Sequence, residues 1–236
     1  MKRRLVPDGL QREHFTEERI MAIAREFAQG GHLEILGRAE RETSRRATLA
    51  RLEKGQDVWI FGYGSLMWNP ALELAETRPA LLSGYHRSFC IWTPIGRGTP
   101  EQPGLMLALE AGGRCRGLAM RIAADLVEPE TQIVWRREMI SGSYLPRWVR
   151  VVTDRGPVAA ITFVVDRRHA RYAGRLSLAR QIESIAFAEG RLGRCCDYLN
   201  NLVWHLDQLG VADGPMHRLL DQVEAHRRQA WRPAGE

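Results

Sequence analysis

Two predicted helices open the chain, each marked by the spacing of its apolar residues. From Phe15 to Gln29, apolar side chains recur at three- and four-residue steps after a helix-start signal at Thr16, which is the pattern of an amphipathic helix. An Ala- and Arg-rich stretch from Arg38 to Lys54 ends at Gly55 and predicts a second, solvent-facing helix. We therefore expect residues 1–56 to form an N-terminal helical arm.

The pattern then changes to short runs of β-prone residues between Gly and Pro clusters, which predicts a small barrel or closed sheet. The expected strands are Asp57 to Gly62, Ala80 to Thr93, Gly104 to Leu109, Arg116 to Ile122, Trp148 to Thr153 and Val158 to Val165. One helix, from Glu128 to Glu138, interrupts the series, with Pro129 in its first turn.

Beyond Asp166 the apolar spacing becomes helical again. The expected helices are Leu176 to Ala188, Cys195 to Leu209 and Met216 to Arg228. We therefore predict an α+β fold, a small β-barrel with flanking helices and an N-terminal helical arm. The barrel domain should span residues 57–228, and residues 229–236 should form a C-terminal tail.

The composition is that of a soluble globular protein, with 44% hydrophobic and 26% charged residues. A surplus of 34 Lys and Arg over 28 Asp and Glu gives a formal charge of +6, which by itself favours an anionic partner. The surplus is spread along the chain, with twelve basic against ten acidic residues over 1–57 and 22 against 18 thereafter. Since there is no basic tail, we do not expect a nucleic-acid partner.

Several locations and chemistries are excluded by what the sequence lacks. No run of about eighteen apolar residues predicts a membrane span, and no apolar stretch follows the basic start, so we expect a cytoplasmic protein without a membrane partner. The scarcity of lysine, only Lys2 and Lys54, argues against Schiff-base or P-loop chemistry. The four cysteines and seven histidines lack metal-site spacing, which predicts reduced thiols and no metal.

A glycine-rich turn is the first candidate site. Val58 to Leu66 is a β-prone run that enters a Gly-Tyr-Gly-Ser turn and begins like a dinucleotide-binding fingerprint. That interpretation fails because Met67 stands where a third glycine is needed and Pro70 interrupts the helix that should follow. What remains is a turn whose backbone N–H groups could face a ligand, because glycine permits positive φ and close approach. Taken alone, such a turn is more often structural than functional.

The second candidate is the end of the predicted helix over 128–138. Glu138 closes this helix beside two apolar residues, and Tyr144 follows a glycine turn. Glutamate in such a position is usually exposed and paired with arginine. If the helix end packs into the barrel mouth, burial would instead raise the pKa of the carboxyl toward the range where it serves as a base.

These two stretches and the spacing between them resemble the ChaC-type γ-glutamylcyclotransferases, which act on glutathione. The resemblance covers most of residues 57–225, whereas the N-terminal arm is similar to longer bacterial members only in general character. Its segments are Val58 to Pro70, Gly84 to Phe89, Gly98 to Leu109, Gly117 to Arg121, Arg137 to Ile140 with Gly142 and Tyr144, Asp166 to His169, Gly190 to Gly193 and Asp197 to Leu199.

The resemblance implies a lyase of cyclotransferase-type fold that needs no cofactor. In its reaction the α-amino group of glutathione attacks the γ-amide carbonyl, which gives 5-oxoproline and Cys-Gly. Glu138 matches the catalytic glutamate of the family, and Tyr144 matches a tyrosine near it with a binding role. Arg87 either meets a glutathione carboxylate or is a charge on the barrel surface. The substrate-binding turn of the family corresponds to Ile60, Phe61, Gly62, Tyr63, Gly64, Ser65 and Leu66.

One departure and three alternatives remain. Cys195 stands where the family commonly has asparagine, and we expect it to be a small buried side chain. The same cyclisation on other γ-glutamyl peptides or amines is the nearest alternative. A catalytically inactive glutathione-binding protein and a nucleic-acid-binding protein are the other two. The sequence does not indicate the oligomeric state.

Overall fold

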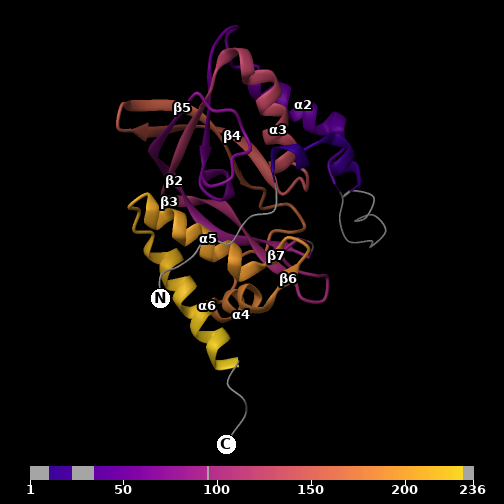
Figure 1. Ribbon diagram of the computed structural model, residues 1–236, viewed down its shortest axis with the longest axis vertical. Coiled ribbons are helices and arrows are strands. Elements are labelled where there is room, and N and C mark those ends of the chain that lie inside the picture. Colours follow the sequence, from indigo (N-terminus) through magenta and orange to yellow (C-terminus); the bar gives the residue numbers. More distant parts are fainter. Residues whose placement is uncertain (1–10, 23–34, 95, 231–236) are drawn as a thin grey trace, which may run out of the picture. The chain divides into compact units, whose positions relative to one another are not determined.

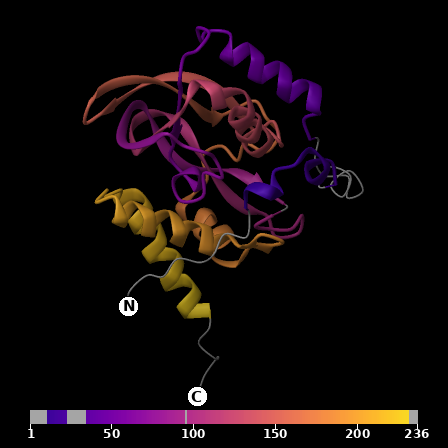
Figure 2. The same cartoon turned by 45° about the horizontal axis from the view of Figure 1, so that its top comes forward.

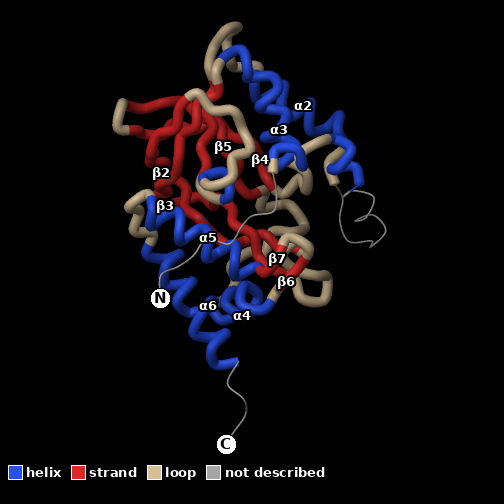
Figure 3. Tube along the Cα trace, viewed as in Figure 1, coloured by secondary structure: helices blue, strands red, loops and turns tan. Residues whose placement is uncertain are grey.

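The computed structural model describes residues 11–22, 35–94 and 96–230 of the 236-residue chain. Figure 3 distinguishes its helices and strands by colour. The strands are β1 (Val58–Gly62), β2 (Glu76–Thr93), β3 (Gly104–Ile122), β4 (Tyr144–Thr153), β5 (Gly156–Val165), β6 (Glu189–Gly190) and β7 (Gly193–Arg194). The helices are α2 (Arg38–Leu49), α3 (Val127–Glu138), α4 (Leu178–Phe187), α5 (Cys195–Gln208) and α6 (Gly214–Ala230). Shorter 3-10 turns span Arg12–His14, Ser65–Met67 and Ala124–Leu126.

The five longer strands close into a barrel in the order β1, β3, β2, β4, β5 (Figures 1 and 3). β1 completes the closure because it pairs antiparallel with β3 and parallel with β5. β4 and β5 form a hairpin whose register runs from Tyr144 opposite Val165 to Thr153 opposite Gly156. The predicted α+β fold with a small barrel and flanking helices is confirmed.

One long strand replaces two predicted ones. β3 continues through residues 110–115, where the sequence predicts a gap between strands. Gly112 and Gly113 in this stretch have φ angles of 102° and 74°. Glycine adopts these values at little cost, and within a strand it marks a bend or bulge rather than an end. The prediction of separate strands is wrong here because the glycines bend the strand instead of terminating it.

The core extends over both faces of β1. Three of its side chains, Val58, Ile60 and Phe61, are each 0% exposed. Since neighbouring side chains on a strand point to opposite faces, burial of Ile60 and Phe61 means that both faces are covered. α3 covers part of the barrel, with the ring of Trp135 5.2 Å from that of Phe163 in an edge-on contact. Burying each such side chain stabilises the fold by about 2 kcal/mol.

α2 lies beside α3 and is less solvent-facing than its sequence predicts (Figure 2). Arg41 and Arg45 of α2 are 3% and 1% exposed. Arg45 donates to Glu42 at 2.8 Å and to Glu128 of α3 at 2.5 Å. It also donates to the hydroxyl of Thr131 at 3.0 Å. The solvent-facing prediction is wrong at these arginines because acceptors outside α2 offset the cost of burying their charge. For Arg45 they are Glu128 and Thr131 of α3, and for Arg41 they are the Leu36 carbonyl and Glu17.

The described residues divide into two compact units. Residues 89–94, 96–107 and 171–230 form one, which contains α4, α5 and α6, and residues 11–22, 35–88 and 108–170 form the other. The first unit contains Cys195, which is 0% exposed at the start of α5. Its thiol donates to the carbonyl of Leu105 at 3.1 Å and accepts from the Leu105 N–H at 3.4 Å. Burial raises the pKa of this thiol to about 12. Cys195 is therefore the small buried side chain that was expected.

The predicted N-terminal arm is only partly described. Residues 17–22 are helical, and the rest of the helix predicted from Phe15 to Gln29 lies outside the described residues. The domain boundaries at residues 57 and 228 stay predictions, and residues 231–236 of the predicted tail are not described. Within the described ranges, no helix combines the length and apolar character that crossing a membrane requires.

Candidate active site

The glycine-rich turn follows β1 directly and leads into the 3-10 turn Ser65–Met67. An added Cβ at Gly62 would lie 2.8 Å from Met120 Cε and 3.1 Å from Leu66 Cβ, so a larger residue there would require these two side chains to shift. Neither Gly62 nor Gly64 has a positive φ. The expected positive φ is therefore absent, and the expected close approach of a ligand to the turn stays a prediction.

Two side chains anchor the turn to the barrel. The hydroxyl of buried Tyr63 donates to the carbonyl of Phe163 at 2.8 Å. Arg87 Nε donates to the carbonyl of Tyr63 at 2.7 Å, and its Nη2 donates to the carbonyl of Arg116. Arg87 is only 5% exposed, so its alternative role as a barrel-surface charge is wrong. Its guanidinium braces the turn through backbone carbonyls, and a contact with substrate carboxylate stays a prediction.

The turn also presents backbone donors. Within the described part of the chain, the N–H groups of Gly64, Ser65 and Leu66 have no hydrogen-bond acceptor. The next N–H groups are occupied, since Met67 donates to the Gly64 carbonyl at 2.8 Å and Asn69 to that of Ser65 at 2.9 Å. Three successive N–H groups at the start of a helical turn form a site for a negatively charged or polarised oxygen.

Arg137, at the end of α3, joins this turn to Glu138. Its Nε donates to Glu138 Oε1 at 3.0 Å, and its Nη2 donates to Ser65 Oγ at 2.7 Å. Its Nη1 donates to the carbonyl of Asn69. One guanidinium, only 9% exposed, thus holds a carboxylate and the glycine-rich turn in a single arrangement.

Glu138 is nearly enclosed, with 15% of its side chain exposed. Burial raises the pKa of this carboxyl above its ordinary value, and the charge and hydrogen bond of Arg137 only partly oppose that rise. The sequence left two alternatives for Glu138, an exposed carboxyl paired with arginine or a buried carboxyl. The structure combines them, because the carboxyl is largely buried and is also paired with Arg137. A carboxyl whose pKa is raised by burial binds a proton more readily and is suited to accept and return one.

The hydrogen bonds show which polar atoms of the site are available to a ligand. Oε1 of Glu138 is occupied by Arg137, and within the described residues Oε2 accepts no hydrogen bond. Ser65 Oγ accepts from Arg137, so its own proton can be directed to another acceptor. The site therefore combines a proton acceptor, a hydroxyl donor and three backbone donors.

The other predicted site residues are placed differently. Ile60, Phe61 and Leu66 are 0%, 0% and 5% exposed, so their side chains belong to the core. The Phe61 carbonyl already accepts from the hydroxyl of Thr162 at 3.0 Å. Tyr144 is half-buried at the start of β4, opposite Val165. Substrate contacts by these four predicted residues stay predictions.

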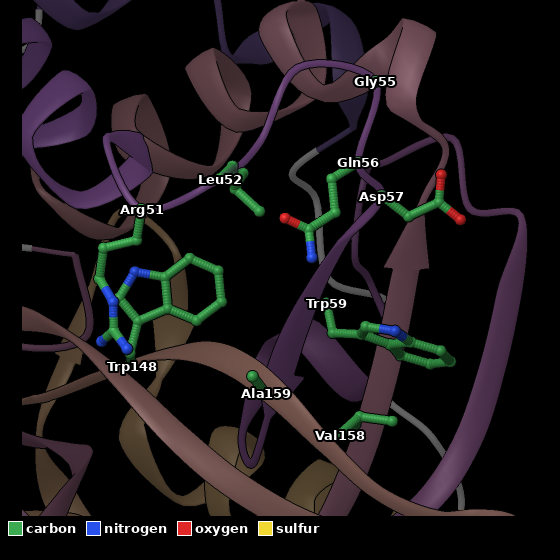
Figure 4. Close-up of a pocket in the computed structure, with 9 residues that line it drawn as sticks. All are labelled: Arg51, Leu52, Gly55, Gln56, Asp57, Trp59, Trp148, Val158 and Ala159. Carbon is green, nitrogen blue, oxygen red and sulfur yellow. The ribbon is translucent and has the colours of Figure 1, made fainter.

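A pocket of about 610 Å³ lies at the opposite end of β1 from Glu138 (Figure 4). In Figure 4 the two tryptophans lie on opposite sides of the space, with Gln56 between them. The lining contains none of the predicted site residues, so we do not assign the reaction to it. It consists of Arg51, Leu52, Gly55, Gln56, Asp57, Trp59, Trp148, Val158 and Ala159. No group of three side chains suited to hold a metal ion occurs within the described ranges.

Sequence reasoning did not predict a role for Arg137. Its position immediately before Glu138 was the available signal, since an adjacent cation changes the pKa of a carboxyl. Neighbours in sequence on a helix do not face each other, however, so adjacency alone does not predict this hydrogen bond. The contact with Ser65 joins residues 72 positions apart and requires the folded barrel.

Comparisons with known proteins place the chain in a family. The family model described as ChaC-like protein matches residues 58–226. A glutathione-specific γ-glutamylcyclotransferase of Escherichia coli (strain K12) is 45% identical over 186 residues, which cover 78% of this chain and 80% of the relative. A Danio rerio protein named glutathione-specific γ-glutamylcyclotransferase 1 is 31% identical over 61% of this chain and 76% of its own.

The fold itself has a solved counterpart. The crystal structure of the yeast γ-glutamyl cyclotransferase specific to glutathione matches with a TM-score of 0.68 and 18% identity, over 73% of this chain and 98% of that protein. At this identity the likeness establishes the fold alone. Together with the family match over residues 58–226, it leads to one conclusion: the chain belongs to the ChaC-like protein family.

Proposed function

We propose that the protein is a glutathione-specific γ-glutamylcyclotransferase that releases 5-oxoproline and Cys-Gly, with Glu138 as its general acid and base. Family membership and the 45% identical E. coli relative support the reaction and the substrate. The observation that carries the mechanism is the enclosed Glu138 carboxyl, which Arg137 joins to the donor-rich turn after β1.

The reaction rearranges bonds within the substrate. The α-amino nitrogen of the γ-glutamyl group forms a bond to the γ-carbonyl carbon, and the amide bond from that carbon to the cysteine nitrogen breaks. The products are the five-membered lactam 5-oxoproline and Cys-Gly. No water is consumed, because the α-amino nitrogen is the nucleophile. The α-ammonium group gives up two protons in becoming the lactam N–H, and the cysteine nitrogen takes up two in leaving as an ammonium group.

Glu138 carries a proton between these two nitrogens. The α-amino group of glutathione is largely protonated at neutral pH and cannot attack until it loses a proton. Oε2 of Glu138, the oxygen that Arg137 does not occupy, accepts the proton and then delivers it to the leaving nitrogen. A pKa raised by burial suits both steps, since the carboxyl must bind and release a proton at similar pH.

The glycine-rich turn positions the substrate and stabilises charge. The N–H groups of Gly64, Ser65 and Leu66 and the hydroxyl of Ser65 are available to the oxygens of the γ-glutamyl group. A donor aimed at the γ-carbonyl oxygen stabilises the negative charge that develops there during attack. Holding the chain folded with the amine near the carbonyl supplies much of the rate of a ring closure.

An end-point assay tests the substrate and the reaction together. Purified protein is incubated with glutathione and, separately, with γ-glutamyl-alanine, and 5-oxoproline and the released amine are quantified. We expect equimolar 5-oxoproline and Cys-Gly from glutathione and much less product from γ-glutamyl-alanine. Comparable turnover of both substrates would replace glutathione specificity by a broader γ-glutamyl specificity, and no 5-oxoproline from either would refute the function.

The setting of this activity rests on the sequence. We expect an enzyme that binds no nucleic acid, because the basic surplus is spread along the chain. We also expect a cytoplasmic location without a membrane partner, because the sequence has no run of about eighteen apolar residues. The measurement is retention on immobilised duplex DNA as salt increases. Retention that persists near physiological ionic strength would contradict this expectation.

A further inference from the structure

The segment that precedes the family match contacts the end of α3 that carries Glu138. The family model begins at residue 58, so residues 11–22 and 35–57 lie outside it. In the structure, Arg137 of α3 stacks on the ring of Phe15, with its Cζ 5.5 Å from the ring centroid. Arg137 is the side chain that holds both Glu138 and Ser65.

Phe15 is buried and is attached to α3 through its backbone. Its side chain is 8% exposed, and its carbonyl accepts from Arg136 of α3 at 3.4 Å. Glu17, two residues on, pairs with Arg136 at 3.6 Å and also with buried Arg41 of α2. The backbone around Phe15 is therefore attached to α3 and to α2.

The same segment is also attached to α3 at Glu130, about two helical turns before Arg137. Arg12 forms two hydrogen bonds with the carboxylate of Glu130, at 2.5 and 2.7 Å, and Glu130 is 1% exposed. Arg12 also donates to the carbonyl of Ala71, which follows the glycine-rich turn. Arg12 thus links the catalytic helix to the chain that leaves the turn, on the side from which Phe15 reaches Arg137.

On this basis we propose that the N-terminal segment over residues 12–17 is a positioning element of the active site, in which Phe15 fixes the guanidinium of Arg137 and so aligns Glu138 with Ser65. Phe15 acts through Arg137 and is a positioning residue. The inference rests on the proposed function, because it assumes that Glu138 is the catalytic group.

The stacking has a physical consequence for alignment. Arg137 makes its three hydrogen bonds with one planar group, so rotation of the guanidinium disturbs the bonds to Glu138, Ser65 and Asn69 together. An aromatic face in contact with a partly desolvated guanidinium restricts that rotation and attracts the cation. An aliphatic side chain of similar volume fills the space but supplies neither effect.

The test compares Phe15→Leu with Phe15→Tyr and with Ile20→Ala, by steady-state kinetics with glutathione across pH. Leu removes the ring, and Tyr keeps it. Ile20 lies three residues beyond this segment, is 2% exposed and takes no part in the described ring contacts and ion pairs of Arg137. Its truncation therefore controls for general loosening of the N-terminal region. Melting temperatures are measured first, and kinetics are measured where all variants are folded.

We expect Phe15→Leu to lower kcat about tenfold, while Phe15→Tyr and Ile20→Ala stay within about twofold of the unmodified protein. In a plot of kcat against pH, the acidic limb is the range where activity falls as Glu138 becomes protonated. This limb should move to higher pH in Phe15→Leu alone. The reason is that Arg137 lowers the pKa of Glu138, and a poorly aligned guanidinium does so less. A purely structural role for Phe15 would not move this limb.

Two results would overturn the inference. One is a Phe15→Leu enzyme with unchanged kcat and an unchanged acidic limb, and the other is an equal loss in Phe15→Leu and Ile20→Ala. If Phe15→Leu is not recovered folded, Phe15→Met serves the same comparison with a more adaptable side chain. Glu138→Gln separates the two proposals, since an active Glu138→Gln enzyme refutes the proposed mechanism, whereas an inactive one with normal Phe15→Leu refutes only the positioning role.

Discussion

Two buried glutamates on α3 each contact an arginine, yet their carboxyl groups behave in opposite ways. Glu130 receives two hydrogen bonds from Arg12 and a third from the N–H of Glu73 at 3.0 Å. Burial alone would raise the pKa of Glu130, but these donors outweigh it and lower that pKa. Glu138 receives one hydrogen bond, from Arg137, and burial raises its pKa.

The comparison shows that contact with an arginine does not by itself set the pKa of a carboxyl. The balance between lost hydration and the donors to the charged form decides the direction. Each donor to the charged form offsets part of its lost hydration. With three donors, Glu130 is a structural anion that joins the N-terminal segment to α3. With one donor among the described residues, at Oε1, Glu138 keeps the capacity to exchange a proton through Oε2.

The largest expected effect comes from exchanging the two carboxyls for amides. Glu138→Gln should lower kcat by about a thousandfold, because a positioned general base typically contributes a hundred- to ten-thousandfold. Glu130→Gln should keep near-normal kcat in the folded enzyme while losing thermal stability. Release of 5-oxoproline and melting temperature measure both. Equal losses of kcat in the two variants would remove the distinction between them.

The next effect concerns the donors of Glu130. Arg12→Ala leaves a 1% exposed carboxylate with a single backbone donor, so it should reduce the free energy of unfolding by about 2 kcal/mol. Urea denaturation at neutral pH measures this loss. Arg46→Ala is the control, since Arg46 is 76% exposed and its ion pair with Glu42 should contribute less than about 1 kcal/mol. Similar losses in both variants would mean that Glu130 does not depend on Arg12.

A smaller effect is expected at the turn. Ser65→Ala removes the hydroxyl that accepts from Arg137 and is available to substrate, so KM for glutathione should rise about tenfold, with a smaller change in kcat. Ser44→Ala is a comparison outside the site, because the Ser44 hydroxyl accepts from the Trp135 ring N–H at 3.1 Å. An unchanged KM in Ser65→Ala would argue against a role for this hydroxyl in binding.

The smallest effect is the pH dependence of stability. Glu130 has a folded pKa below the ordinary 4.5, so its contribution is present above that pH and is lost as pH falls through the folded pKa. Glu138 has a folded pKa above 4.5, so the stability from its protonated form is present below 4.5 and is lost as pH rises through the folded pKa.

The two amide variants should therefore diverge in opposite directions. As pH rises above 4.5, Glu138→Gln should become more stable relative to the unmodified protein. As pH falls below 4.5, the stability deficit of Glu130→Gln should shrink. Urea denaturation between about pH 3 and pH 8 measures both trends. Parallel curves for the two variants would contradict the assigned pKa directions.

Much of the fold was predictable because the signals that define its elements are local. A β-prone run before a glycine turn indicated β1, and helix signals indicated α3 and the helices after residue 166, with ends within a few residues of those observed. The continuous β3 was not predicted, because a glycine that bends a strand and one that ends it have the same sequence signature.

The candidate site shows the same limit. The turn after β1 and Glu138 were both identified from the sequence. Their roles were taken from a family resemblance, and the family model confirms that the chain belongs to that family. Arg87 could not be placed, since whether an arginine is buried depends on acceptors such as the Arg116 carbonyl 29 residues away. The contact between Phe15 and Arg137 joins residues 122 positions apart and has no local signature.

The sequence by itself determined the order of helices and strands, the glycine-rich turn and the choice of Glu138 as the group to test. It did so because backbone preferences and apolar periodicity act over a few neighbouring residues. Only the tertiary structure decided that Glu130 is held as an anion while Glu138 is left with one donor and a raised pKa. The free energy of a buried charge depends on every group packed around it, and folding brings those groups from distant parts of the chain.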